Sequence, residues 1–189
     1  RLTSIGNYAF QNCYNIQDIY ITNIAAWCNI SGLNNLMEYG ASNKKLYINN
    51  ELATSITIPD GVTAIPSYAF SYCTGLTSVT IPNSVTSIGG AAFSGCKGLT
   101  NITIPDSVTN IGYGVFSGCS SLESITIPFV GAKAGVTSSN TYQYPFGYIF
   151  GTSSYIGSIA TEQYYYGSST SSNTYSTYYI PPSLKSVTV

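Results

Sequence analysis

The chain has 189 residues, of which only 7% are charged, and its formal net charge at pH 7 is −1. Soluble domains usually carry about 25% charged residues, so the surface of this protein must consist of Ser, Thr, Asn, Tyr and Gly. The sequence offers no basic stripe for a phosphate backbone and no polybasic anchor for lipid, which argues against nucleic acid and membrane surfaces as partners.

A phrase of 23 residues recurs along the chain. Cys73, Cys96 and Cys119 lie 23 positions apart, and each stands three residues after a phenylalanine. Residues 2–21 are an earlier copy of the same phrase. Self-similarity at such a period indicates a solenoid, in which each repeat buries its apolar face by stacking on its neighbours.

Each repeat is predicted to contain a short strand that ends at a proline. In the copy around Cys73, the alternation of Val79 and Ile81 with polar residues predicts a strand with these two side chains facing inward. Pro82 ends it, because proline lacks the N–H that a ladder requires. Residues 67–70 have roughly helical spacing, which predicts one or two turns of α or 3-10 helix on the outer wall. Successive strands then pair in parallel and form a curved sheet.

Side chains at equivalent positions are expected to form columns inside the solenoid. Phe70, Phe93 and Phe116 should stack in the core. The cysteines three positions after the repeat phenylalanine are interpreted as small buried residues with free thiols. They are Cys13, Cys73, Cys96 and Cys119. Disulfides between adjacent coils and a metal site stay open as alternatives, although the chain has no histidine and its thiols are strung along the solenoid.

The full phrase, I-P-x-x-V-T-x-I-x-x-x-A-F-x-x-C-x-x-L-x-x-h-x-I-P with h apolar, resembles the BspA-like, or Treponema pallidum-type, leucine-rich repeat of bacterial surface proteins. The resemblance covers residues 1–21 and about 53–128. The pieces 24–30 and 146–151 resemble insertions in such proteins from gut Firmicutes. The family implies a leucine-rich-repeat solenoid with a right-handed α/β-type coil, a parallel β-sheet on the concave face and short helical or 3-10 turns on the convex face.

We expect one elongated domain over residues 1–189, in a chain that looks like a piece of a longer protein because it opens within a repeat. An insertion at about 22–52 interrupts the period. Its residues 25–28 predict a short helix with Trp27 covering the core, and residues 45–52 predict a hairpin. A packed insertion on the solenoid wall is favoured here over a binding site.

A second interruption, an irregular excursion at about 131–179, holds ten tyrosines among Ser, Thr, Gly and Asn. Antibody loops use this mixture for recognition, because tyrosine supplies a rigid ring and a hydroxyl at low entropic cost. A long loop whose aromatic rings patch the last coil is the alternative. The candidate ligand-binding residues are three consecutive tyrosines and two residues at the adjoining end of the sheet. They are Tyr164, Tyr165, Tyr166, Glu123 and Thr126.

Catalysis finds little support in the sequence. Without histidine there can be no Ser-His-Asp or Cys-His arrangement, the acidic residues are scattered, and there is no phosphate-binding loop. We expect no enzyme activity, no cofactor and no metal. No apolar run approaches the ~18 residues of a membrane-spanning helix. The family resemblance implies an extracellular or cell-surface module that adheres to host protein, glycan or other cells, and the alternative is a stalk that displays another domain.

Overall fold

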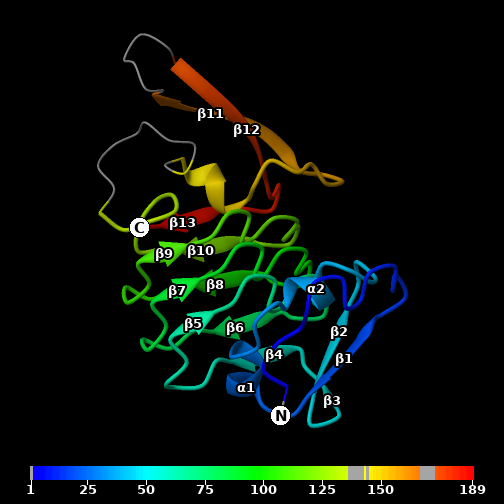
Figure 1. Cartoon of the computed structure of the whole chain (residues 1–189). Coiled ribbons are helices and arrows are strands. Elements are labelled where there is room, and N and C mark those ends of the chain that lie inside the picture. Colours follow the sequence, from blue (N-terminus) through cyan, green and yellow to red (C-terminus); the bar gives the residue numbers. More distant parts are fainter. Residues whose placement is uncertain (1, 136–142, 144, 167–172) are drawn as a thin grey trace.

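The structure is a computed structural model that describes residues 2–135, 143, 145–166 and 173–189, with the side chains of 165, 166 and 173 excepted. Its coils stack into a parallel β-solenoid, with the N-terminus near one end and the C-terminus at the other (Figure 1). The fold class predicted from the repeat is therefore confirmed. None of the helices within these ranges has the length and apolar character needed to cross a bilayer.

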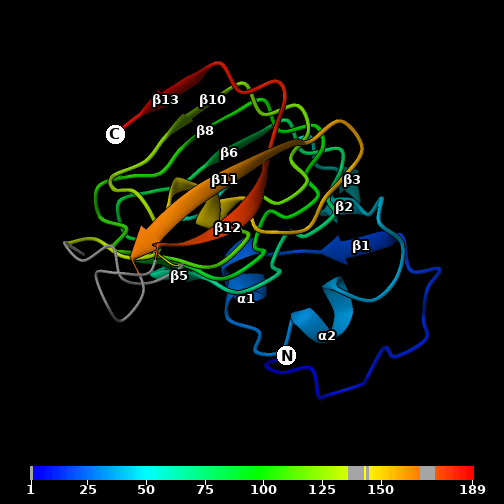
Figure 2. The same ribbon diagram turned by 90° about the horizontal axis from the view of Figure 1, so that it is seen from above.

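Five short strands at equivalent repeat positions form the principal row. They are β4 (Ser55–Thr57), β6 (Ser78–Thr80), β8 (Asn101–Thr103), β10 (Ser124–Thr126) and β13 (Ser186–Thr188). β4 pairs with β6, and β10 pairs in parallel with both β8 and β13. The central residues Ile102 and Ile125 are buried, whereas the Ser, Asn and Thr on either side point outward. Seen from above, this row follows one side of the coil (Figure 2).

A second row of two-residue strands lies after the repeat prolines. It comprises β5 (Ala64–Ile65), β7 (Ser87–Ile88) and β9 (Asn110–Ile111), which pair in parallel. The apolar residue of each strand is buried, as Ile88 shows. Each coil therefore contributes two short ladders to its neighbours.

The outer wall is a chain of hydrogen-bonded turns. The N–H groups of Ala69, Ser71 and Cys73 donate to the carbonyl three residues earlier, as in a 3-10 helix. Positive φ values of 62° at Tyr68 and 61° at Tyr72 divide this path into separate turns. The N–H groups at the alternate positions donate to carbonyls of the next coil. Every amide of this wall segment is thus hydrogen-bonded, but residues 67–70 form separate turns where one or two turns of helix were predicted.

Two positions of each wall segment adopt the left-handed conformation. The pairs are Tyr8 and Asn12, Tyr68 and Tyr72, Ala91 and Gly95, and Gly114 and Gly118. Side chains other than glycine rarely adopt positive φ, because their Cβ crowds the backbone. The turns thus require this conformation even where tyrosine or alanine occupies it.

The core contains the predicted phenylalanine column. The ring of Phe93 lies 5.6 Å from that of Phe70 and 6.0 Å from that of Phe116, and all three side chains are fully buried. The thiols of the repeat bridge the coils: Cys96 donates to the Phe70 carbonyl at 3.2 Å, and Cys119 donates to the Phe93 carbonyl at 3.1 Å. All five cysteines are free thiols.

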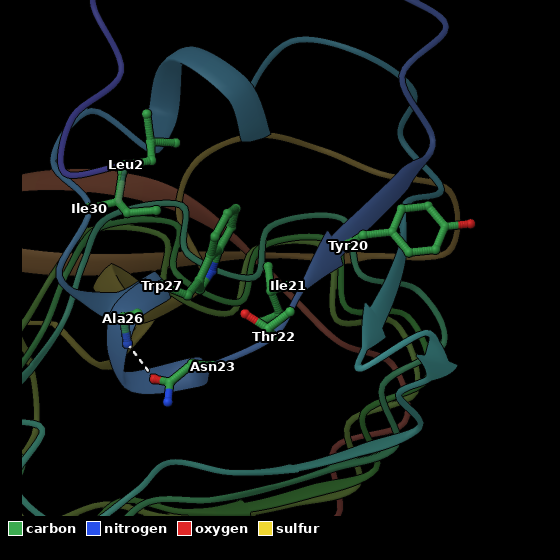
Figure 3. Close-up of a pocket in the computed structure, with 8 residues that line it drawn as sticks. All are labelled: Leu2, Tyr20, Ile21, Thr22, Asn23, Ala26, Trp27 and Ile30. Atoms are coloured by element: carbon green, nitrogen blue, oxygen red, sulfur yellow. Dashed lines mark hydrogen bonds between the residues drawn. The ribbon is translucent and has the colours of Figure 1, made fainter.

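The insertion after the first coil packs beneath the coil that carries Cys73. It contains α1 (Ile24–Cys28) and α2 (Asn34–Met37), and its strands β2 (Lys45–Ile48) and β3 (Glu51–Leu52) extend β1 (Asp18–Ile21). Asn23 caps α1 by accepting from the Ala26 N–H at 2.7 Å (Figure 3). The predicted helix with a buried Trp27 is present, and so is the hairpin, which turns at Asn49 and Asn50 with positive φ.

The prediction that Cys13 is buried is wrong, because its side chain is exposed. The insertion takes the place that the first wall segment would have occupied. The indole N–H of Trp27 donates to the Ala69 carbonyl at 2.9 Å, and the Lys44 N–H donates to the Tyr72 carbonyl at 2.8 Å. Residues around Cys13 are therefore left outside the stacked core.

Lys44 is a fully buried cation at this junction. Its ammonium donates to the Ala41 carbonyl at 2.8 Å and lies 5.1 Å from the centre of the Tyr72 ring. Burial lowers the pKa of Lys44, and the neighbouring Cys73 partly offsets that effect. The side chain thus joins the insertion to the outer wall of the next coil.

The C-terminal end is covered by residues that have left the repeat. The 3-10 helix η1 (Phe146–Ile149) continues the wall, since the N–H groups of Gly114 and Phe116 donate to the Tyr148 and Ile149 carbonyls. The segment expected to be irregular then forms a long antiparallel hairpin of β11 (Ile159–Tyr166) and β12 (Asn173–Ile180). The hairpin lies across the end of the solenoid (Figures 1 and 2).

Replacing Phe93 with Ala should lower the free energy of unfolding by about 3–5 kcal/mol, because the coils above and below cannot collapse into the gap. Phe10 stands at the same repeat position but is only half-buried, so Phe10→Ala should cost clearly less. Urea unfolding of both variants measures the difference. A loss below ~1 kcal/mol for Phe93→Ala would contradict the internal column.

Thiol labelling should separate Cys13 from the other cysteines. Burial raises the pKa of Cys28, Cys73 and Cys119 to about 12 and that of Cys96 well above its ordinary value, so at pH 8 these thiols stay protonated and shielded. Maleimide labelling followed by mass spectrometry should modify Cys13 rapidly in the folded protein and all five thiols after unfolding. Rapid native labelling at Cys96 or Cys119 would refute the core assignment.

Candidate functional site

The structure places the candidate residues on two different elements. Tyr164, Tyr165 and Tyr166 form the end of β11 in the hairpin. Thr126 is the last residue of β10, and Glu123 directly precedes that strand. The side chains of Tyr165 and Tyr166 lie outside the described part of the chain.

One face of the hairpin is anchored on η1. The Tyr178 side chain is fully buried and packs on Gly147, where an added Cβ would collide with the ring. The Gly147 N–H donates to Gln163 Oε1 at 2.7 Å, and the Tyr179 N–H donates to the Gly151 carbonyl at 3.1 Å. A two-stranded hairpin is marginal on its own in water, so this anchoring is what holds it in place.

The opposite face of the hairpin is open. Tyr164 and Tyr175 pair across the two strands with ring centres 5.6 Å apart, and their side chains are 62% and 52% exposed. Glu162 lies two residues from Tyr164 on the same face, and its carboxylate accepts a long 3.5 Å contact from the tyrosine hydroxyl. We call Glu162, Tyr164, Tyr175 and Thr177 the hairpin face.

Glu123 and Thr126 belong to the open side of the principal strand row. Thr126 lies in register with Thr103 and Thr188, so the three threonines form a column along this side. Glu123 forms an ion pair with Lys185 at 3.0 Å, in which both side chains are more than half exposed. Exposed pairs contribute at most about 1 kcal/mol, because water screens them. The ion-pair partner of Glu123 is thus a neighbour in the solenoid, and the structure does not join it to the hairpin face.

Tyr175 and Tyr178 were not identified from the sequence as residues of a strand that pairs with the three consecutive tyrosines. Both stretches of the hairpin are rich in Tyr and Thr, which favour strands. Their length, eight residues each, and the turn-forming Gly and Ser between them are the signals that could have indicated the pairing. Register then brings Tyr164 opposite Tyr175.

A cavity of about 470 Å³ lies beside Trp27 at the N-terminal end (Figure 3). Its lining is mainly apolar and includes Leu2, Ile21 and Ile30. Trp27 is buried and its N–H is already bonded to Ala69, which gives it a packing role. Among the described residues no group of His, Cys, Asp and Glu is arranged to hold a metal ion.

Comparison with known families decides the identity of the repeat. The family described as BspA type leucine rich repeat region matches residues 1–35 and 42–146 in six copies. This chain belongs to the BspA-type leucine-rich-repeat family. The match extends over both the regular coils and most of the insertion.

Several solved structures are similar to this BspA-type chain. A leucine rich cell surface protein from Faecalibacterium prausnitzii is 34% identical (TM-score 0.42), over 67% of this chain and 36% of that one. A leucine-rich repeat protein from Eubacterium ventriosum is 26% identical (0.47), over 67% and 41%, and the Treponema pallidum leucine-rich repeat protein is 22% identical (0.42), over 78% and 60%. The matched region is therefore less than two thirds of each of those proteins. Among curated proteins there is no match.

Replacing Gly147 with Ala should release the hairpin, because the new methyl group collides with Tyr178. Amide hydrogen exchange in residues 159–164 and 174–180 should become at least about tenfold faster, while exchange in the coils stays unchanged. Gly75→Ala is the matched control, since an added Cβ there meets no atom within 4 Å. Unchanged exchange in the Gly147 variant would show that the hairpin is held by other contacts.

Proposed function

We propose that this chain is a non-catalytic binding module of a bacterial surface or secreted protein, and that the hairpin face is its contact with a partner protein. The observation that carries the proposal is an exposed pair of tyrosines on an anchored, regular hairpin. The wider role would be adhesion to host protein, glycan or other cells. Membership in a leucine-rich-repeat family supports binding in general.

The hairpin face has the chemistry of a protein contact. Tyr164 and Tyr175 can bury large ring surfaces while their hydroxyls still form hydrogen bonds, and interface hot spots are enriched in tyrosine for this reason. Because Tyr178 and Gln163 fix the opposite face, little ordering entropy is lost on binding. By contrast, the open side of the strand row presents short Ser, Asn and Thr side chains, which make weak and easily hydrated contacts.

The non-catalytic role is part of the proposal. It is supported by the lack of histidine in the chain and by the scattering of its acidic residues. A stalk that displays another domain is the competing function, and it would have no ligand of its own.

Binding should depend on the two exposed tyrosines. The chain would be tested by surface plasmon resonance against fibronectin, laminin and fibrinogen, and by adhesion to intact bacteria. Tyr164→Ser combined with Tyr175→Ser should weaken a detected interaction at least tenfold, or ~1.4 kcal/mol, without lowering the unfolding midpoint. Tyr14→Ser is the control, because Tyr14 is 64% exposed but lies in the first coil.

Three outcomes would count against the proposal. Equal loss in the Tyr14 variant would mean that the contact is not specific to the hairpin face. Unchanged affinity in the double variant would move the site to the strand row or the insertion. No binding to any of these partners would favour the stalk.

A further inference from the structure

A hollow in the outer wall lies on a different surface from the hairpin face. It consists of two adjoining cavities with volumes of about 440 and 400 Å³. Residues from several coils line both cavities and so join them into one depression, which we call the wall basin. The shared residues are Tyr72, Ser94, Ser117 and Ser153.

The wall basin exists because the positive-φ positions carry large side chains in one coil and small residues in the next two. The coil of Cys73 has Tyr68 and Tyr72 there, whereas the next two coils have Ala91, Gly95, Gly114 and Gly118. The ring of Tyr72 lies over Gly95, where an added Cβ would come within 2.5 Å of Tyr72 Cδ1. At these positions, two successive coils therefore carry no side chain larger than a methyl group, and a tyrosine bounds the floor at one axial end.

Both irregular segments of the chain supply the rims. Glu38 and Ser42 come from the insertion, and residues 153–156 come from the stretch that precedes the hairpin. On that second rim the Tyr113 hydroxyl lies 2.6 Å from Thr152 Oγ1 and accepts from the Thr152 N–H at 2.7 Å, which fixes the ring. Segments far apart in the sequence thus meet around one depression.

The lining is aromatic and hydroxylated, with balanced charge. Serine hydroxyls line the floor and rims, and the charged side chains of the lining are one acid, Glu38, and one base, Lys97. The hydroxyl of Tyr155 is buried and has no hydrogen-bond partner among the described residues, so the ring rather than the oxygen borders the wall basin. Nothing here would select a strongly charged ligand.

The backbone of the wall basin does not suit an extended peptide. The N–H groups of Ala91, Phe93 and Gly95 already donate to carbonyls of the next coil, so the floor has no free strand edge to which a peptide could add. Tyrosine rings together with many hydroxyls instead suit a ligand that has apolar C–H faces and its own hydroxyl groups.

We propose that the wall basin binds a linear, uncharged oligosaccharide that lies along the solenoid axis. The sugar rings would stack on Tyr72 and Tyr113, and the serines would bond the sugar hydroxyls. Adjacent coils are spaced by about 4.8 Å, the usual separation of paired strands. That spacing is close to the advance of one hexose in an extended chain, so successive sugar units would meet Ser94 and Ser117, which are equivalent residues of adjacent coils.

Isothermal titration with five hexasaccharides tests the proposal: cellohexaose, mannohexaose, xylohexaose, chitohexaose and maltohexaose. The wild-type chain should bind at least one of them. Gly118→Asn should weaken that binding at least about tenfold, because the new side chain fills the floor. The substitution is tolerated, since asparagine accepts positive φ and its Cβ would lie 3.5 Å from the nearest atom, Gly95 Cα.

Two further variants make the result decisive. Gly61→Asn is the matched control: Gly61 also has positive φ, an added Cβ meets no atom within 4 Å, and the residue lies outside the wall basin, so affinity should be retained. Gly114→Asn fills the other half of the floor, where the nearest atom to the new Cβ is Ser117 Cβ at 3.7 Å. If Gly118→Asn lowers the unfolding midpoint, the affinity of the Gly114→Asn variant for the sugar tests the proposal instead.

No binding to any of the five sugars would overturn the proposal, and so would unchanged affinity in both basin variants. The test is independent of the hairpin. Combined Tyr164→Ser and Tyr175→Ser should leave sugar binding intact, whereas the basin variants should leave a protein contact of the hairpin face intact.

Discussion

Each coil of this solenoid can bury its apolar side chains only against the coils next to it. The phenylalanine column, the thiols that donate to carbonyls of the preceding coil, and the amides of both ladders and of the wall all act between neighbours. Stability is then close to a sum of coil-to-coil interfaces. The first and last coils of the stack each lack a neighbouring coil on one side, and the irregular segments of the chain lie there.

At the N-terminal side, the insertion supplies Trp27 and Lys44 as a substitute layer beneath the coil of Cys73. A buried lysine is costly unless its donors find acceptors, and the Ala41 carbonyl and the Tyr72 ring meet that need. At the other end, η1 continues the wall and the hairpin covers it through Tyr178. The segments that interrupt the repeat therefore complete the core and also form the rims and faces on which binding is proposed.

The repeat made most of the solenoid predictable. A period of 23 residues sets which side chains stack, so the strand registers, the phenylalanine column and the buried thiols of Cys73, Cys96 and Cys119 followed from spacing alone. The exposure of Cys13 did not follow from spacing, because the environment of this residue depends on where the insertion packs. The turns of the outer wall were also not predictable from the sequence. Positive φ is usually indicated by glycine, but here tyrosine and alanine occupy several of these positions. The hairpin face was only partly anticipated: the tyrosines were recognised, but their pairing depends on long-range register and on Gly147, which had no visible pattern.

The length of the wall basin along the solenoid axis can change by whole coils. Its floor spans the coils that separate the Tyr68 and Tyr72 rim from the rim at residues 153–156. Deleting or duplicating one 23-residue coil would keep every ladder in register, so relatives with different numbers of coils could hold the same two rims at different separations. Each added coil would lengthen the hollow by about 4.8 Å, the spacing of adjacent strands. The number of coils, and not new side chains, would then set the length of the ligand that the wall basin binds.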